Sequence, residues 1–131
     1  MIVIDCSYTL ALVMPDELRP ASMLTVMKDN LAVPVIWPLE VANALRNSLR
    51  RGRLKERQVA GLCADMGDFD VEVVATPHVL PKRHVDAALA HDLTPYDALY
   101  LELALQRRCA LATCDADLAA AAQRAGVVVY S

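Results

Sequence analysis

Short apolar runs alternate with longer amphipathic stretches along the whole chain. The runs are rich in Val, Ile, Leu and Ala and carry few charges, which is typical of parallel strands covered on both faces. They comprise residues 2–4, 33–37, 71–75, 110–113 and 127–129. Each run therefore predicts one short, buried strand.

The stretches between these runs have the apolar spacing of helices. They comprise residues 7–14, 20–28, 38–51, 55–67, 80–91, 95–107 and 116–125. Pro38 and Pro95 suit the first turn of a helix, and Gly52 and Gly126 suit the position just past a helix end. Because strands separated by helices pair in parallel, the pattern predicts a three-layer α/β/α sandwich with a central parallel sheet. No linker or repeat interrupts the pattern, so we expect residues 1–131 to form a single domain.

The composition narrows the class of protein. Hydrophobic residues make up 56% of the chain and aromatic residues 5%, so aliphatic side chains build the core, and the apolar excess suggests a buried subunit interface. No apolar run approaches the roughly 20 residues of a membrane-spanning helix, and no basic, cleavable leader precedes the first strand. We therefore expect a soluble, cytoplasmic protein. Its four cysteines lack Cys-x-x-Cys spacing, which favours free thiols over a zinc or redox site.

Four acidic residues lie where a predicted strand ends or a predicted helix begins. Asp5 follows the first strand and Asp115 follows the fourth, while Glu40 and Asp97 lie in the first turns of helices. Residues just past the carboxyl ends of parallel strands converge on one crevice, where open α/β sheets bind ligands. Carboxylates gathered there repel one another unless a cation is present. Such oxygen-rich clusters suit Mg²⁺ or Mn²⁺, so the sequence predicts a metal-dependent enzyme that acts on phosphodiesters.

Two of these acids, those near the first and second strands, can also be explained by a structural role. Asp5, or Ser7 two residues later, suits the N-cap of the first helix. Glu40 suits a first helical turn because the helix dipole favours negative charge there. Asn43 and Asn47 follow Glu40 at helical spacing, however, and this arrangement favours a polar wall that lines a cleft.

Asp97 and Asp115 have alternatives of the same kind. Thr94 precedes Asp97 by three residues, as in a capping box. The helix that follows is apolar nearly all round and is therefore expected to be buried, which favours Asp97 as a ligand. Asp115 and Asp117 both follow the fourth strand, and we expect one to cap the last helix and the other to bind metal.

Four segments resemble the motifs of a known nuclease family. Residues 1–7 (MIVIDCS) resemble the opening strand and Asp-x-Ser turn of PIN-domain nucleases, and residues 38–45 (PLEVANAL) resemble their second motif. Residues 94–104 (TPYDALYLELA) and 111–118 (LATCDADL) are similar to the third and fourth motifs. The order, the spacing and the total length resemble those of VapC-type toxin ribonucleases, the toxic halves of type II toxin–antitoxin pairs.

The resemblance implies roles for individual residues. It implies metal binding by Asp5, Glu40, Asp97 and Asp115, with Asp117 as a peripheral ligand, and supporting positions for Ser7, Asn43 and Thr113. The expected cation is Mg²⁺, with Mn²⁺ as the alternative. A cation held by these carboxylates would activate a water molecule and polarise a phosphoryl oxygen. The resemblance implies 5′-phosphate and 3′-hydroxyl ends for the cleaved RNA.

The resemblance also implies partners. They are an RNA substrate, a second copy of the chain in a homodimer, and a cognate antitoxin that restrains the enzyme. The flexible tail of such an antitoxin would lie in a groove and present a basic residue to the acids. Residues 10–13 and 23–27 offer apolar, partly Met-rich surface for that tail.

A basic stretch adjoins the helix of Glu40. It holds six of the chain's 13 lysines and arginines, namely Arg46, Arg50, Arg51, Arg53, Lys55 and Arg57. Because the net charge is −3, any attraction to RNA must be local, and the first four arginines are our candidates for following an RNA backbone. A solvated helix end or a surface for a partner protein explains the same stretch, and the sequence does not separate these interpretations.

Two further functions are compatible with the chain. Asp5-x-Ser7-x-Thr9 is close to the Asp-x-Asp-x-Thr loop of haloacid-dehalogenase-like phosphatases, but Ser7 replaces the second acid and no lysine follows the later strands. A non-catalytic PIN-like interaction domain would keep the fold and bind only a partner, although four idle acids that repel one another would cost stability. Metal-dependent cleavage of single-stranded RNA distinguishes the three functions.

Overall fold

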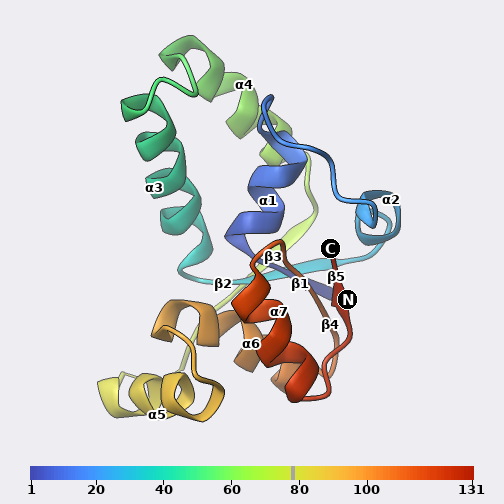
Figure 1. Ribbon diagram of the computed structural model, residues 1–131, viewed down its shortest axis with the longest axis vertical. Helices are drawn as coiled ribbons and strands as arrows, with labels where there is room; N and C mark the ends of the chain where they lie inside the picture. Colours follow the sequence, from blue (N-terminus) through green and yellow to red (C-terminus); the bar gives the residue numbers. More distant parts are fainter. Residues whose placement is uncertain (78) are drawn as a thin grey trace.

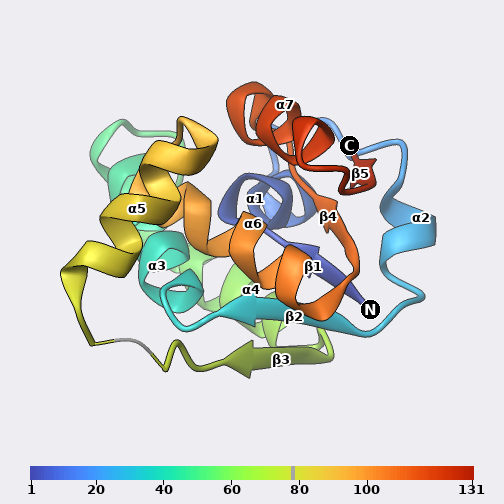
Figure 2. The ribbon, with the colours of Figure 1, turned by 90° about the horizontal axis from the view of Figure 1, so that it is seen from below.

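The computed structural model describes residues 1–77 and 79–131. Within those ranges the backbone forms a parallel sheet of five strands in the order β3-β2-β1-β4-β5. The strands are β1 (Ile2–Ile4), β2 (Leu31–Pro34), β3 (Val71–Val74), β4 (Ala110–Ala112) and β5 (Val129–Tyr130). Figure 2 shows β1 at the centre of the sheet, between β2 and β4. Because all strands run the same way, the residues that follow them gather at one edge.

Helices form a layer on each side of this sheet (Figure 1). They are α1 (Cys6–Val13), α2 (Met23–Val26), α3 (Trp37–Arg50), α4 (Glu56–Gly67), α5 (Pro81–His91), α6 (Pro95–Arg107) and α7 (Ala116–Arg124). The first four lie on one side and the last three on the other, so the predicted three-layer α/β/α sandwich is confirmed. In the described part of the chain, no helix combines the length and the apolar character that crossing a membrane requires.

The strand β1 contributes to two separate cores. Val3 points toward α6 and α7, where it is buried with Leu101 and Leu118. Ile4 points to the opposite face and is buried with Tyr8 of α1. This alternation follows from the pleat of a strand, and it explains why the run has no polar position until Asp5.

The helices α3 and α4 form an arm that packs on α1 rather than on the sheet (Figure 1). A third apolar cluster joins the three helices, and it contains Val13, Met14, Val41, Leu45, Leu54, Leu62 and Met66. Arg53, between α3 and α4, also bonds Asp16 and Glu17 in the loop that follows α1, with nitrogen–oxygen distances of 2.9 and 3.1 Å. The arm therefore has both an apolar and an ionic attachment to the rest of the protein.

The predicted strand at 33–37 is shifted in the structure. β2 spans Leu31–Pro34, and the chain then turns so that α3 begins at Trp37. The apolar run continues through this turn, so hydrophobic periodicity does not mark the end of the strand. The turn matters for the site, because it brings Glu40 into the first turn of α3.

The predicted closing strand at 127–129 is also shifted, since β5 spans Val129–Tyr130. The N–H of Val127 donates to the carbonyl oxygen of Ala122 at 2.9 Å, which uses Val127 to close the end of α7. The helix predicted at 20–28 is shorter than expected and spans Met23–Val26. The other predicted helices agree with the structure to within a residue or two at each end.

Candidate active site

Asp5 lies at the carboxyl end of β1 and only 4% of its surface is exposed. Its Oδ1 accepts a hydrogen bond from the backbone N–H of Tyr8 at 2.8 Å, so Asp5 is the N-cap of α1. The hydroxyl of Thr113 donates to Oδ2 at 2.6 Å, and the hydroxyl of Ser7 lies 2.8 Å from both oxygens. Ser7 therefore does not cap the helix and instead bonds the Asp5 carboxylate.

Thr113 connects the ends of β1 and β4. Its side chain is 1% exposed, and its oxygen accepts from the backbone N–H of Asp115 at 3.0 Å while its hydroxyl donates to Asp5. The backbone N–H of Cys114 donates to the hydroxyl of Ser7 at 2.9 Å. The structure thus places Ser7 and Thr113 beside the first acid, as the resemblance implies, although their part in any reaction stays a prediction.

Glu40 is half-buried in the first turn of α3 and meets α6 through a tyrosine. The hydroxyl of Tyr100 donates to Oε1 of Glu40 at 2.6 Å. Burial, together with this bond and the charge of Glu40, strongly raises the pKa of the Tyr100 phenol, so the phenol stays protonated. The sequence interpretation missed Tyr100, which lies in an aliphatic helix one turn after Asp97.

Asp97 lies in the first turn of α6, three residues after Thr94, which is the N-cap that the sequence indicated. The side chain of Thr94 accepts from the backbone N–H of Asp97 at 3.2 Å. Burial raises the pKa of the Asp97 carboxyl, and the charges of Asp115 and Glu40 raise it further. The helix cap is therefore real, and the Asp97 carboxyl nevertheless lies close enough to other acids for their charges to raise its pKa.

The structure settles which acid caps α7. Oδ1 of Asp115 accepts from the backbone N–H of Leu118 at 2.9 Å, so Asp115 is the N-cap. Asp117 is exposed in the first turn of the same helix. Asp115 is thus the one of the two acids that caps the last helix, and metal binding by Asp115 or Asp117 stays a prediction.

The acids from four segments influence one another electrostatically. Burial raises the pKa of Asp5 to about 6, against the lowering effect of its hydrogen bonds with Thr113, Tyr8 and Ser7, and the charge of Asp97 adds to the rise. Burial also raises the pKa of the Cys6 thiol to about 12, with further contributions from Glu40, Asp5 and Asp97. Asp5, Glu40, Asp97 and Asp115 thus share one electronegative region at the carboxyl edge of the sheet.

The donor set of this region suits a hard divalent cation in its chemistry. All four candidates are carboxylates, and a cation relieves both the burial of Asp5 and the repulsion felt by Asp97. Within residues 1–77 and 79–131, however, no three acidic, histidine or cysteine side chains already stand close enough to hold one ion. Side chains other than that of the firmly bonded Asp5 would therefore have to move inward as an ion binds.

Two residues that the sequence interpretation missed fix the start of α3 against α1. The indole N–H of Trp37 donates to the hydroxyl oxygen of Thr9 at 2.9 Å. The hydroxyl of Thr9 in turn donates to the backbone oxygen of Asp5 at 2.8 Å. This relay sets the helix of Glu40 relative to the strand of Asp5.

The remaining predicted residues lie along α3 and beyond it. Asn43 is exposed one turn after Glu40. Arg46, Arg50 and Arg51 are exposed, and none of the described residues forms an ion pair with them, whereas Arg53 bonds Asp16 and Glu17. Arg53 is therefore less suited than the other three to follow an RNA backbone.

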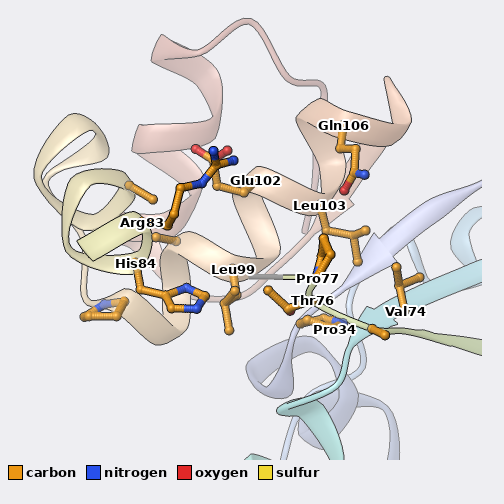
Figure 3. A pocket seen from close by; sticks show the side chains of 14 residues that line it. Pro34, Val74, Thr76, Pro77, Arg83, His84, Leu99, Glu102, Leu103 and Gln106 are labelled. Atoms are coloured by element: carbon orange, nitrogen blue, oxygen red, sulfur yellow. The ribbon is translucent and has the colours of Figure 1, made fainter. Parts of the chain in front are cut away.

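The described residues also form cavities outside the acid region. A groove of about 490 Å³ runs between α3 and α4, and its wall includes Trp37, Val41, Leu45, Val59, Cys63 and Met66. A second cavity of about 310 Å³ lies between α5 and α6, with His84, Leu99 and Leu103 in its wall (Figure 3). Neither wall contains any of the four acids. The α6 residues of the second cavity recur at helical spacing on the face opposite Asp97.

Comparison with known proteins identifies relatives over most of the chain. The family model described as PIN domain matches residues 2–124. Ribonuclease VapC3 from Pyrobaculum aerophilum is 32% identical over 121 residues, which cover 90% of this chain and 92% of that protein.

Two solved structures share the fold. PAE2754 from Pyrobaculum aerophilum has a TM-score of 0.73 at 24% identity, over 98% of this chain and 82% of that chain. VapC20 from Mycobacterium tuberculosis, described as a sarcin–ricin loop cleaving toxin, has a TM-score of 0.69 at 20% identity, over 92% of this chain and 95% of that chain. At these identities the likeness to both structures concerns the fold alone.

Proposed function

Because the chain belongs to the PIN-domain family and to its VapC-type branch, we propose that it is a divalent-metal-dependent endoribonuclease and the toxin of a type II toxin–antitoxin pair. The observation that carries this proposal is the shared electronegative region, in which Asp97 feels the charges of Asp115 and Glu40 and contributes to the raised pKa of Asp5. Membership of the PIN-domain family argues against the phosphatase alternative.

We assign the cation to Asp5, Glu40, Asp97 and Asp115, with Asp117 at the periphery. When bound, Mg²⁺ or Mn²⁺ supplies the acidity that activates a water molecule and the positive charge that a phosphodiester needs. The chain's own part is to present oxygen atoms and to hold them. Thr113, Ser7 and the N–H of Tyr8 hold Asp5 in one orientation, so its position is set before any ion arrives.

The RNA substrate would cross the carboxyl edge of the sheet and continue over α3. Arg46, Arg50 and Arg51 are exposed on or just after that helix, on the same chain segment as Glu40 and Asn43. An overall charge of −3 makes such a local basic surface necessary for RNA binding. The relative VapC20 is described as acting on the sarcin–ricin loop, and for this chain we propose RNA without a particular sequence.

The antitoxin would occupy the groove between α3 and α4. The groove is lined mainly by apolar side chains and begins at Trp37 and Pro38, just before Glu40. An apolar helix or strand in this groove could present a basic side chain to the acids. The surface predicted at 10–13 and 23–27 is less suitable, because Val13 and Val26 are buried.

The homodimer would form through α5. All residues of this helix are described, and none of their side chains is buried. Leu80, just before this helix, and Val85 and Leu89 within it are exposed apolar side chains. Apolar surface of this kind favours burial against a second copy. A cytoplasmic location is part of the same proposal, since the RNA and the antitoxin would meet the toxin there.

The test is cleavage of single-stranded RNA by the purified protein with Mg²⁺ or Mn²⁺, and with a chelator. We expect cleavage only with the metal, and we expect Asp97→Asn to remove it while the exposed Asp65→Asn on α4 does not. Metal-independent cleavage that survives Asp97→Asn would point to a contaminating nuclease. A wild-type protein that binds its partner but never cleaves RNA would favour the non-catalytic interaction domain.

The toxin part of the proposal has a separate test. Expression of the chain alone should arrest growth, and Asp5→Asn should relieve the arrest at equal soluble protein. Harmless wild-type expression would contradict the toxin role even if the purified protein cleaves RNA.

A further inference from the structure

We propose that Tyr100 is a positioning residue for Glu40, and that its buried phenol holds one oxygen of that carboxylate so that the other is directed at the cation. This inference rests on the proposed metal-dependent function. It assigns a role to a residue outside the four acids and outside the polar residues that the sequence singled out.

The contact itself is short and one-sided. Tyr100 is 1% exposed, and its hydroxyl oxygen lies 2.6 Å from Oε1 of Glu40. This length is typical of a hydroxyl bonded to a charged carboxylate. None of the described residues donates to Oε2 of Glu40 through a hydrogen bond. One oxygen is therefore held, and the other is available to an ion.

Glu40 needs such a partner more than Asp5 does. It is half exposed and has three side-chain torsions, so an unheld carboxylate would sample several rotamers. The phenol of Tyr100 has two torsions and is packed in the core with Val3 and Leu111. A rigid donor thus restricts a flexible acceptor.

The position of Tyr100 on α6 makes the restriction useful. Asp97 lies one turn earlier on the same helix, so the side chains of Asp97 and Tyr100 share part of one helix surface. The bond between Tyr100 and Glu40 therefore links the first turn of α3 to the second turn of α6. One hydroxyl group thus fixes the helix of Glu40 relative to the helix of Asp97.

A second buried hydroxyl provides a control. Ser48 is 5% exposed, and its hydroxyl donates to the backbone oxygen of Ala44 at 2.9 Å, which is an uncharged partner within α3. Ser48→Ala and Tyr100→Phe each remove one buried hydroxyl. Only Tyr100→Phe removes a bond to a proposed ligand of the metal.

The experiment measures the dissociation constant of Mn²⁺ by calorimetry for the wild-type protein and both variants. Tyr100→Phe should weaken Mn²⁺ binding roughly 10- to 100-fold, as is usual when the hydrogen-bond partner of a metal ligand is lost. RNA cleavage by Tyr100→Phe should fall at low Mn²⁺ and recover as Mn²⁺ is raised. Ser48→Ala should match the wild type in both measurements. Melting curves without metal show whether the variants are folded.

A second comparison separates positioning from a general loss of packing. In a Glu40→Gln background, Tyr100→Phe should weaken Mn²⁺ binding no further, because the carboxylate that it positions is already gone. Equal weakening in both backgrounds, or an Mn²⁺ affinity of Tyr100→Phe equal to or above that of the wild type, would overturn this inference alone. A folded wild-type protein that binds no Mn²⁺ would overturn the proposed metal dependence, and this inference with it.

Discussion

The two halves of the acid site are held in different ways. The locked half comprises Asp5, Ser7, Thr113 and Asp115, whose side chains are linked to one another or to helix N-termini by hydrogen bonds. The open half comprises Glu40, Asn43 and Asp97, which are half-buried or exposed. In this half, the bond from Tyr100 holds one oxygen of Glu40 and leaves the other available. Folding alone thus fixes the locked half, whereas the open half leaves room for a cation and a substrate to complete the geometry.

The largest expected effect is the loss of nuclease activity in either half. We expect RNA cleavage to fall by more than about 100-fold in each of four variants, Asp5→Asn, Glu40→Gln, Asp97→Asn and Asp115→Asn. Loss of a residue that only hydrogen-bonds a metal ligand costs up to about 100-fold, and loss of a ligand itself should cost more. Metal-free melting temperatures should not fall, because removing one charge relieves repulsion among the others. Activity assays and thermal melts with a chelator test this. Sharply lower melting temperatures for all four variants would show that the acids are structural.

The second effect concerns pH and the buried acid of the locked half. The pKa of Asp5 is raised from 3.8 to about 6, so the folded metal-free protein favours the protonated acid. The stability that Asp5 contributes is therefore complete below its ordinary pKa and is lost as pH rises through about 6. A difference of this size corresponds to about 3 kcal/mol.

Thermal melts of the wild type and Asp5→Asn between pH about 4.5 and 7.5, with a chelator, test this linkage. The wild type should become less stable relative to the variant as pH rises through this window. Two parallel curves would mean that Asp5 is not protonated preferentially in the folded state. Added Mg²⁺ should make the wild type more stable than Asp5→Asn near neutral pH, because the cation binds the ionised acid.

A smaller effect is expected when the locked half loses its central hydroxyl. Thr113→Val keeps the shape of the side chain but leaves Oδ2 of Asp5 and the N–H of Asp115 without this partner. We expect a loss of about 2–3 kcal/mol of stability. Denaturant unfolding should show this loss for Thr113→Val and not for Thr25→Val, an exposed threonine in α2. Equal stabilities of the two variants would show that the hydroxyl of Thr113 does not stabilise the locked half.

The smallest effects come from one supporting residue in each half. Ser7→Ala removes a bond to Asp5 and should lower stability by about 1 kcal/mol. Asn43→Ala should leave stability unchanged because the side chain is exposed, and should lower RNA cleavage several-fold through weaker substrate binding. Unfolding curves and KM values measure the two outcomes. The opposite assignment, with Asn43 stabilising and Ser7 affecting only KM, would reverse the distinction between the halves.

The sequence predicts the layers of this fold better than the ends of its elements. Alternating apolar runs and helical stretches are enough to indicate a parallel sheet between helices. The turn between Pro34 and Trp37 is not visible in the sequence, because an apolar run passes through it and Trp37 packs against both layers. Val127 likewise is apolar and buried although it lies outside the sheet.

The sequence also predicts the acids better than the groups that hold them. Asp5 and Asp115 follow strands and Asp97 opens a buried helix, which are positions with a local signature. Tyr100 and Thr9 act through partners on other elements, and a tyrosine in an apolar helix or a threonine near a helix start is explained equally well by packing. Only the three-dimensional pairing shows that their hydroxyls face polar groups of the site.

The bond between Thr113 and Asp5 joins residues that are 108 positions apart in the chain. A ribosome makes β1 before β4, and contacts of such high sequence separation form late. A nascent chain therefore carries Asp5 without Asp115 until the segment after β4 has been made. The proposed enzyme would gain its full set of acids only after that segment has left the ribosome and paired with β1, and a restraining partner made nearby could bind it at that moment.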